Sequence, residues 1–194
     1  LSTDTDMTAL HFDDGIPWQE ALGGAQYVGP YGIELGARAA LLPDGHARYV
    51  AINPLNPTRD GLALHRGAGP NEDLPAEWAG RNLSDREVVN AFLNHSEWMI
   101  ETFDPDYFAY AIDANLLAAR APQMWPAFLE LAETVYVTTK RRYPDLPVFV
   151  TMQAEEFHRN PDVQAGVIRA LLPFTDLVAV SAYPYTILPN AGAM

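Results

Sequence analysis

Short runs of apolar, β-branched and aromatic residues alternate along this chain with longer stretches in which apolar residues recur at helical spacing. The short runs are apolar on both faces, which is typical of parallel strands that are covered by helices or enclosed in a barrel. We predict strands over residues 48–52, 107–112, 148–152 and 177–181, with a weaker fifth candidate over residues 7–12.

The longer stretches carry helix signals. Ser84-Asp85-Arg86-Glu87 is a capping-box pattern that predicts a helix start, with Ser84 as the cap and Glu87 reaching back to it. Pro126 is predicted in the first turn of a second helix, because an interior proline costs about 3 kcal/mol. This helix ends near Tyr143-Pro144, and a third runs from about Asp162 to a stop at Pro173. Residues 33–42 are compatible with either helix or strand.

Strands that alternate with helices predict an α/β fold with a parallel sheet. No glycine-rich phosphate fingerprint follows any strand, which disfavours a nucleotide-binding doubly wound fold. Instead, every predicted strand ends in polar or aromatic side chains, as at the active-site face of a (β/α)₈ barrel. These residues are His11, Asp13, Asn53, Asp113, Asn115, Gln153, Glu155, Ser181, Tyr183 and Tyr185.

The length of 194 residues predicts a single domain. A complete TIM barrel takes about 250 residues, so we predict a partial one, with about five or six of eight βα units. We expect it to lack its first strand and its last two. The chain begins at Leu1 and stops at Met194 with no closing element, so we also expect it to be an excerpt.

Charge and composition exclude several classes of partner. Lys and Arg number 12 against 25 Asp and Glu, and the net charge of −13 argues against nucleic acid or an anionic membrane. The densest basic run, Lys140-Arg141-Arg142, lies at a predicted helix end, where cations face the helix dipole. No membrane-spanning run or signal peptide is evident. Without cysteine, disulfides, thiolate nucleophiles and cysteine-based zinc sites are excluded.

Several motifs resemble those of a known group of enzymes. Residues 106–115, Asp-Tyr-Phe-Ala-Tyr-Ala-Ile-Asp-Ala-Asn, resemble the fourth strand of clan A glycoside hydrolases, where a Glu preceded by Asn is the acid/base. Trp125-x-x-Phe128 and residues 143–148 resemble barrels related to glycoside hydrolase family 53, the arabinogalactan endo-β-1,4-galactanases. Residues 180–185 resemble the sixth-strand end, where an aromatic residue lines the sugar site. Gly15-Ile16-Pro17-Trp18 and Asn53-Pro54-Leu55 fit the same looser pattern, over residues 6–185 in all.

The resemblance implies a carbohydrate substrate, carboxylate acid/base chemistry, no cofactor, and an extracellular or periplasmic location. Two departures matter. Ile112-Asp113 stands where the family has Asn-Glu, and aspartate is one methylene shorter. A shortfall of about 1 Å at a reacting atom can cost about 10²-fold in rate. The family nucleophile ends a seventh strand for which no candidate precedes Met194, so we expect it further along the chain.

Each candidate has a structural alternative. Asp113 is predicted as the general acid, held protonated by apolar surroundings, or else as a cap of the following helix. Asn115 is predicted either to bind a sugar hydroxyl or to form a loop turn. Trp18, Tyr183 and Tyr185 are candidate stacking platforms, although aromatic side chains also serve as core or rim packing.

The remaining candidates are polar. His11 and Asp13 lie on the same side of a strand and are predicted to bind sugar hydroxyls. A metal site is not predicted, because His46, His65, His95 and His158 do not lie at strand ends. Asn53, Gln153 and Glu155 are further substrate-binding candidates, with a solvated helix start as the alternative for Glu155. No Gly-x-Ser-x-Gly elbow supports a serine nucleophile.

Together these observations favour a glycoside hydrolase acting on a β-linked polysaccharide or oligosaccharide. The alternative is a carbohydrate-binding or catalytically impaired barrel without hydrolytic activity. The first hypothesis requires Asp113, Asn115 and Tyr183 to converge on one cleft, together with at least one of His11, Asp13 and Gln153.

Overall fold

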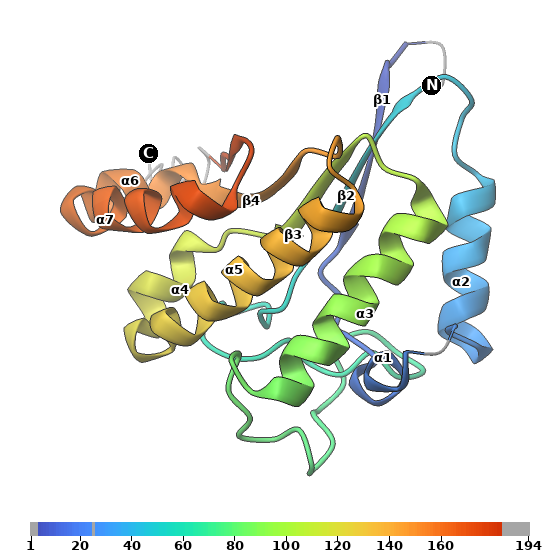
Figure 1. Ribbon diagram of the computed structural model, residues 1–194, viewed down its shortest axis with the longest axis horizontal. Helices are drawn as coiled ribbons and strands as arrows, with labels where there is room; N and C mark the ends of the chain where they lie inside the picture. Colours follow the sequence, from blue (N-terminus) through green and yellow to red (C-terminus); the bar gives the residue numbers. More distant parts are fainter. Residues whose placement is uncertain (1–3, 25, 184–194) are drawn as a thin grey trace, which may run out of the picture.

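A computed structural model describes residues 4–24 and 26–183 of the chain. In it, five parallel strands pair in chain order to form one sheet (Figure 1). The strands are β1 Met7–Phe12, β2 Ala47–Ile52, β3 Tyr107–Ala111, β4 Val148–Gln153 and β5 Val178–Ser181. The four predicted strands and the weaker fifth candidate are therefore confirmed.

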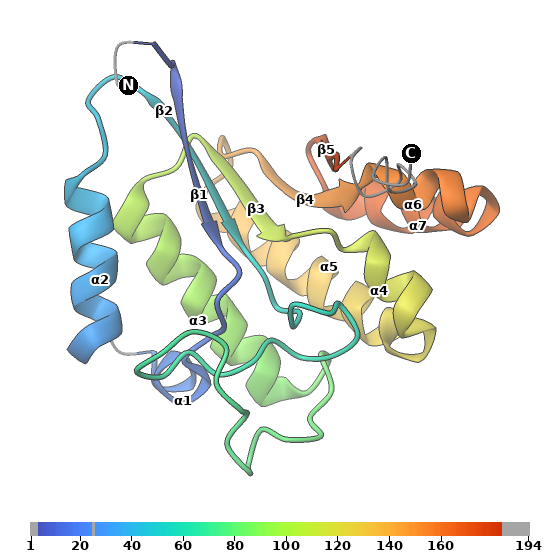
Figure 2. The same cartoon turned by 180° about the vertical axis from the view of Figure 1, so that it is seen from behind.

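Helices connect the strands and cover one face of the sheet. The helices are α1 Trp18–Gly23, α2 Gly29–Ala40, α3 Arg86–Phe103, α4 Asn115–Arg120, α5 Trp125–Arg142, α6 Ala154–Arg159 and α7 Pro161–Leu171, with short 3-10 helices η1 Pro122–Met124 and η2 Leu172–Phe174. Helices α3 and α5 lie in front of the sheet in Figure 1 and behind it in Figure 2, and α2 lies beside α3. Parallel strands in chain order with helices on the outer face form part of a (β/α)₈ barrel, which confirms the predicted fold class.

The two faces of each strand belong to two separate cores. Val50, Phe108 and Val150 point outward and are buried against the apolar stripes of α3 and α5 in the main core. Inward-pointing residues form a second, smaller cluster on the concave face, which contains Ala51, Ala109, Ile112 and Phe149, with Tyr49, Tyr107 and Ala179 packed against it. Because both faces are apolar, the strands read as continuous apolar runs in the sequence.

Helix boundaries agree with the sequence in part. Pro126 lies in the first turn of α5, and the Lys140–Arg142 run forms its last turn, as predicted. The capping-box prediction is wrong, since α3 begins at Arg86 with Asp85 at the N-cap and no side-chain cap. The Asp85 carboxylate instead accepts a hydrogen bond from the Asn82 backbone, which closes a turn before the helix. Most of residues 33–42 are helical, within α2.

One buried polar pair ties α3 to the segment before α2. His95 is 1% exposed, and its Nδ1 lies 2.8 Å from the hydroxyl of Tyr27. Burial lowers the pKa of the His95 imidazole to about 3, because a charged ring would have no water around it. The ring is therefore neutral in the folded protein at physiological pH.

Strands β1 and β5 each have one strand neighbour within the described part of the chain, and Met7, Val178 and Val180 on them are about half exposed. Unpaired strand edges template association. We therefore expect residues 1–194 expressed alone to sediment as oligomers or to precipitate. Val178→Lys should raise the monomer fraction in sedimentation velocity, since charge on an edge blocks pairing. A monodisperse parent that unfolds cooperatively would contradict this prediction.

Candidate functional site

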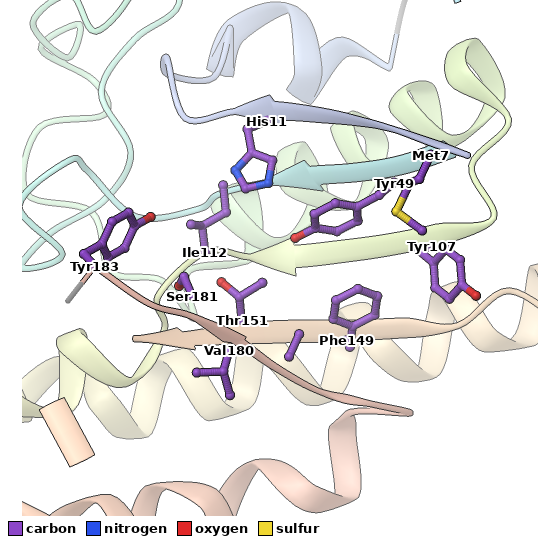
Figure 3. A pocket seen from close by; sticks show the side chains of 11 residues that line it. Met7, His11, Tyr49, Tyr107, Ile112, Phe149, Thr151, Val180, Ser181 and Tyr183 are labelled. Carbon is purple, nitrogen blue, oxygen red and sulfur yellow. The ribbon is translucent and has the colours of Figure 1, made fainter. Parts of the chain in front are cut away.

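The concave face of the sheet carries a hollow of about 380 Å³, lined by side chains from all five strands and the segments that follow them. Figure 3 shows Tyr107 and Phe149 toward the amino ends of the strands, with His11, Ser181 and Tyr183 toward the carboxyl ends. The hollow is therefore mostly apolar toward the amino ends of the strands and has a polar rim at their carboxyl ends. The rim lies at the barrel end that builds active sites.

Asp113 follows β3 in an unusual backbone conformation. Its φ of +53° is left-handed, and the pairing of β3 with β4 is irregular between Ala109 and Ala111. Bulges of this kind re-aim side chains and are common beside active sites. Two hydrogen bonds hold the conformation: the Asp113 N–H donates to Thr151 Oγ1 at 2.9 Å, and the Ile112 N–H donates to Asn53 Oδ1 at 3.3 Å.

The Asp113 carboxylate is directed toward β5. The residue is 6% exposed, and its Oδ1 accepts a hydrogen bond from the hydroxyl of Ser181. Helix α4 has Ala114 at its N-cap and no side-chain cap. Asp113 therefore does not cap helix α4 with its side chain. Its carboxylate is buried next to the hollow.

Tyr49 is an inward-facing side chain that the sequence reasoning missed. Its ring stacks on Phe149 with centroids 5.8 Å apart and meets His11 edge-on at 5.3 Å. Burial raises the pKa of the Tyr49 phenol to about 12, and the negative charges of Asp113 and Tyr183 add to the shift. Tyr49 is thus a neutral hydrogen-bond donor that responds electrostatically to Asp113. Its position two residues before inward-facing Ala51 was the available signal.

This electrostatic link gives a prediction that needs no substrate. Tyr49 should remain protonated at about pH 11, where an ordinary tyrosine is mostly ionised. In Asp113→Asn its titration should move to lower pH, because a negative neighbour has been removed. The difference in phenolate absorbance between each protein and its Tyr49→Phe version measures this. Asp106→Asn, at the opposite end of β3, is the matched control and should leave the titration unchanged.

Two predicted residues, His11 and Tyr183, do line the hollow. The Tyr183 N–H donates to Glu155 Oε1, which fixes the chain just after β5. Glu155 lies in the first turn of α6 but is 2% exposed, so it is not the solvated helix start of the alternative interpretation. Its second oxygen has no hydrogen-bond partner in the described part of the chain.

The Asp13 carboxylate accepts hydrogen bonds from both Asn53 and Arg59. Asn53 Nδ2 donates to Asp13 Oδ1 at 2.9 Å, and Arg59 makes two hydrogen bonds to the Asp13 carboxylate, the shorter at 2.5 Å. Arg59 is buried and has a φ of +55°. This cluster braces Ile112 and hence Asp113 from the β2 side. Arg59 comes from a loop without periodicity, so no sequence signal marked it.

Trp18 and Asn115 do not line the hollow, and Asn115 therefore does not share a cleft with Tyr183 as expected. Trp18 is fully buried, stacks on Trp78 at 5.2 Å and donates to the Ala63 carbonyl. Asn115 is also fully buried, and its amide bonds the backbone of Gln153 and the side chain of Gln164. Both side chains act as packing and bracing groups, since no face of either is open.

The other sequence candidates add less. Gln153 is half-buried at the end of β4, its Oε1 has no hydrogen-bond partner among the described residues, and it does not line the hollow. Tyr185 lies outside the described residues. Within residues 4–24 and 26–183, no group of three or more His, Asp or Glu side chains is arranged to hold a metal ion. Among the same residues, no helix is long and apolar enough to cross a membrane.

The fold is that of a (β/α)₈ barrel, of which the described residues form five strands. The catalytic domain of glycoside hydrolase family 53 from Ignisphaera aggregans has a similar structure, with a TM-score of 0.56 at 17% sequence identity. The likeness covers 93% of this chain and 49% of that domain. No protein-family model matches the sequence, and no curated protein matches it. At this identity the comparison establishes the fold alone.

Proposed function

We propose that the protein is a glycoside hydrolase that cleaves β-linked polysaccharide or oligosaccharide, with Asp113 as the general acid. The observation that carries this proposal is the buried Asp113 carboxylate, held by Ser181 at the carboxyl ends of the strands, next to a hollow that aromatic side chains line. Glycosidases use a carboxylic acid in this role to protonate the leaving-group oxygen.

The surroundings of Asp113 suit a sugar. Sugar rings have apolar faces that aromatic side chains cover and hydroxyls that polar groups fix. Tyr49 and Tyr183 supply rings on the wall of the hollow, and His11 supplies a polar group. The neutral Tyr49 phenol is a donor at any physiological pH.

Hydrolysis tests the proposal directly. Release of reducing ends would be measured on β-1,4-galactan, arabinogalactan, β-glucan, xylan and mannan, with the full-length parent protein and with its Asp113→Asn variant. We expect the parent to cleave at least one of them and Asp113→Asn to cleave none. Asp106→Asn is the control, because Asp106 lies at the opposite end of β3, where it accepts a bond from the Arg48 backbone.

A carbohydrate-binding barrel without turnover is the second candidate, favoured by the short aspartate side chain at the acid position. It predicts a different pattern. The parent and Asp113→Asn would bind the same oligosaccharide with equal affinity in calorimetry, and neither would release reducing ends. That result would refute hydrolysis and retain the sugar site.

A further inference from the structure

Two hydroxyl groups from neighbouring strands hold Asp113, and they hold different parts of it. Thr151 on β4 accepts the Asp113 main-chain N–H at 2.9 Å, which fixes the backbone. Ser181 on β5 donates to the side chain at Oδ1. Thr151 and Ser181 both line the hollow (Figure 3), whereas Asp113 is not one of its lining residues and lies next to it through these two hydrogen bonds.

The main-chain bond leaves the carboxylate free to turn. The terminal torsion of an aspartate is broad and roughly two-fold, so a fixed backbone does not orient the two oxygens. A donor on one oxygen removes this freedom. It occupies Oδ1 and leaves Oδ2 for a second partner.

We propose that Ser181 is a positioning residue whose hydroxyl fixes the orientation of the Asp113 carboxylate, so that Oδ2 is presented to the leaving-group oxygen of a sugar. The effect on catalysis rests on the proposed role of Asp113 as general acid, whereas the orientation of the carboxylate by Ser181 does not depend on that role. The aspartate side chain is one methylene shorter than that of glutamate. If the Asp113 carboxylate rotates away from the sugar, the side chain therefore has no further torsion with which to bring Oδ2 back.

A purely structural role for Ser181 would be to dock β5, since its Oγ also lies 3.4 Å from the Met152 carbonyl. Two other features already dock this strand. Four residues of β5 pair in register with β4, from Val178 to Ser181. Glu155 holds the Tyr183 N–H just beyond the strand end. Loss of one hydroxyl therefore leaves the strand in place and frees the carboxylate.

The kinetic test compares Ser181→Ala, Ser181→Thr and Thr175→Ala. The last removes a hydroxyl that bonds the Leu177 carbonyl at the opposite end of β5. We expect Ser181→Ala to lower kcat by about 10²-fold, the cost of misplacing a catalytic group by about 1 Å, with KM within about twofold. Ser181→Thr should restore kcat, because it keeps the hydroxyl, and Thr175→Ala should equal the parent. Unchanged kcat in Ser181→Ala, with Asp113→Asn inactive, would overturn the proposal.

A second readout does not depend on activity. The carboxyl ¹³C resonance of Asp113 should move in Ser181→Ala and return in Ser181→Thr, while melting temperatures stay together. No movement in Ser181→Ala would overturn the positioning role even if no substrate were found. Movement without any hydrolysis by the parent would retain the positioning role and defeat the hydrolase proposal instead.

Discussion

Replacing Asp113 with alanine is expected to lower kcat by about 10²- to 10⁴-fold, which is the usual contribution of a general acid. KM should change little, because proton transfer develops in the transition state and the aromatic walls of the hollow remain. The measurement is steady-state hydrolysis of whichever β-linked substrate the parent cleaves. Asp106→Ala, at the amino end of the same strand, should behave as the parent.

Asp113→Glu distinguishes two explanations for the aspartate at this position. The added methylene restores the acid type of the resembling family but pushes the carboxylate against Ser181. A glutamate variant more active than the parent would indicate that the aspartate impairs an ancestral enzyme. A less active one would indicate that the site is built around the shorter side chain. Full activity in Asp113→Ala would remove Asp113 from the mechanism.

Acid is expected to destabilise the fold through His95. The folded-state pKa of about 3 lies below the ordinary value of 6.5, so the neutral ring contributes stability above pH 6.5. That contribution is lost as the pH falls toward 3, because the unfolded state takes up the proton first. Between pH 6.5 and about pH 4.5 the loss should be on the order of 2–3 kcal/mol.

Urea unfolding at a series of pH values measures this loss. His95→Gln cannot be protonated, so its free energy of unfolding should fall by that much less over the same interval. His158, which is exposed on α6, supplies the matched variant His158→Gln, and its pH dependence should follow the parent. Equal pH slopes in the parent and in His95→Gln would show that His95 is not a buried neutral group.

The strands were predictable because their signal is local. Runs such as residues 148–152 are apolar on both faces, and this pattern survives whatever surrounds them. The start of α3 was not predictable in the same way. Asp85, rather than Ser84, accepts a hydrogen bond from a backbone N–H before the helix, that of Asn82. The short helix α1 carries no long periodic stripe, so its packing rather than its pattern determines it.

The sequence predicted at which end of the strands the site residues lie, but not which way their side chains point. Carboxyl ends of parallel strands meet at one edge, so His11, Asp113 and Tyr183 were expected there. Whether a strand-end side chain faces the hollow depends on the loop that follows. Asn115 turns away because it opens α4 and bonds β4 and α7. Ser181 was noted only as a polar strand end, since its importance lies in a contact to another strand.

The irregularity between Ala109 and Ala111 has a consequence for comparing sequences. Tyr110 and Ala111 both belong to the outer core, while Ala109 and Ile112 both face inward, so one extra residue is absorbed within β3. A strand without the extra residue would alternate regularly and would still turn the residue equivalent to Ile112 inward. In a relative with one residue fewer between Ala109 and Ile112, an alignment without a gap there would therefore set its acidic side chain against the wrong residue of this chain. Gap placement in this strand, more than the identity of the acid, therefore decides which aligned carboxylates are equivalent.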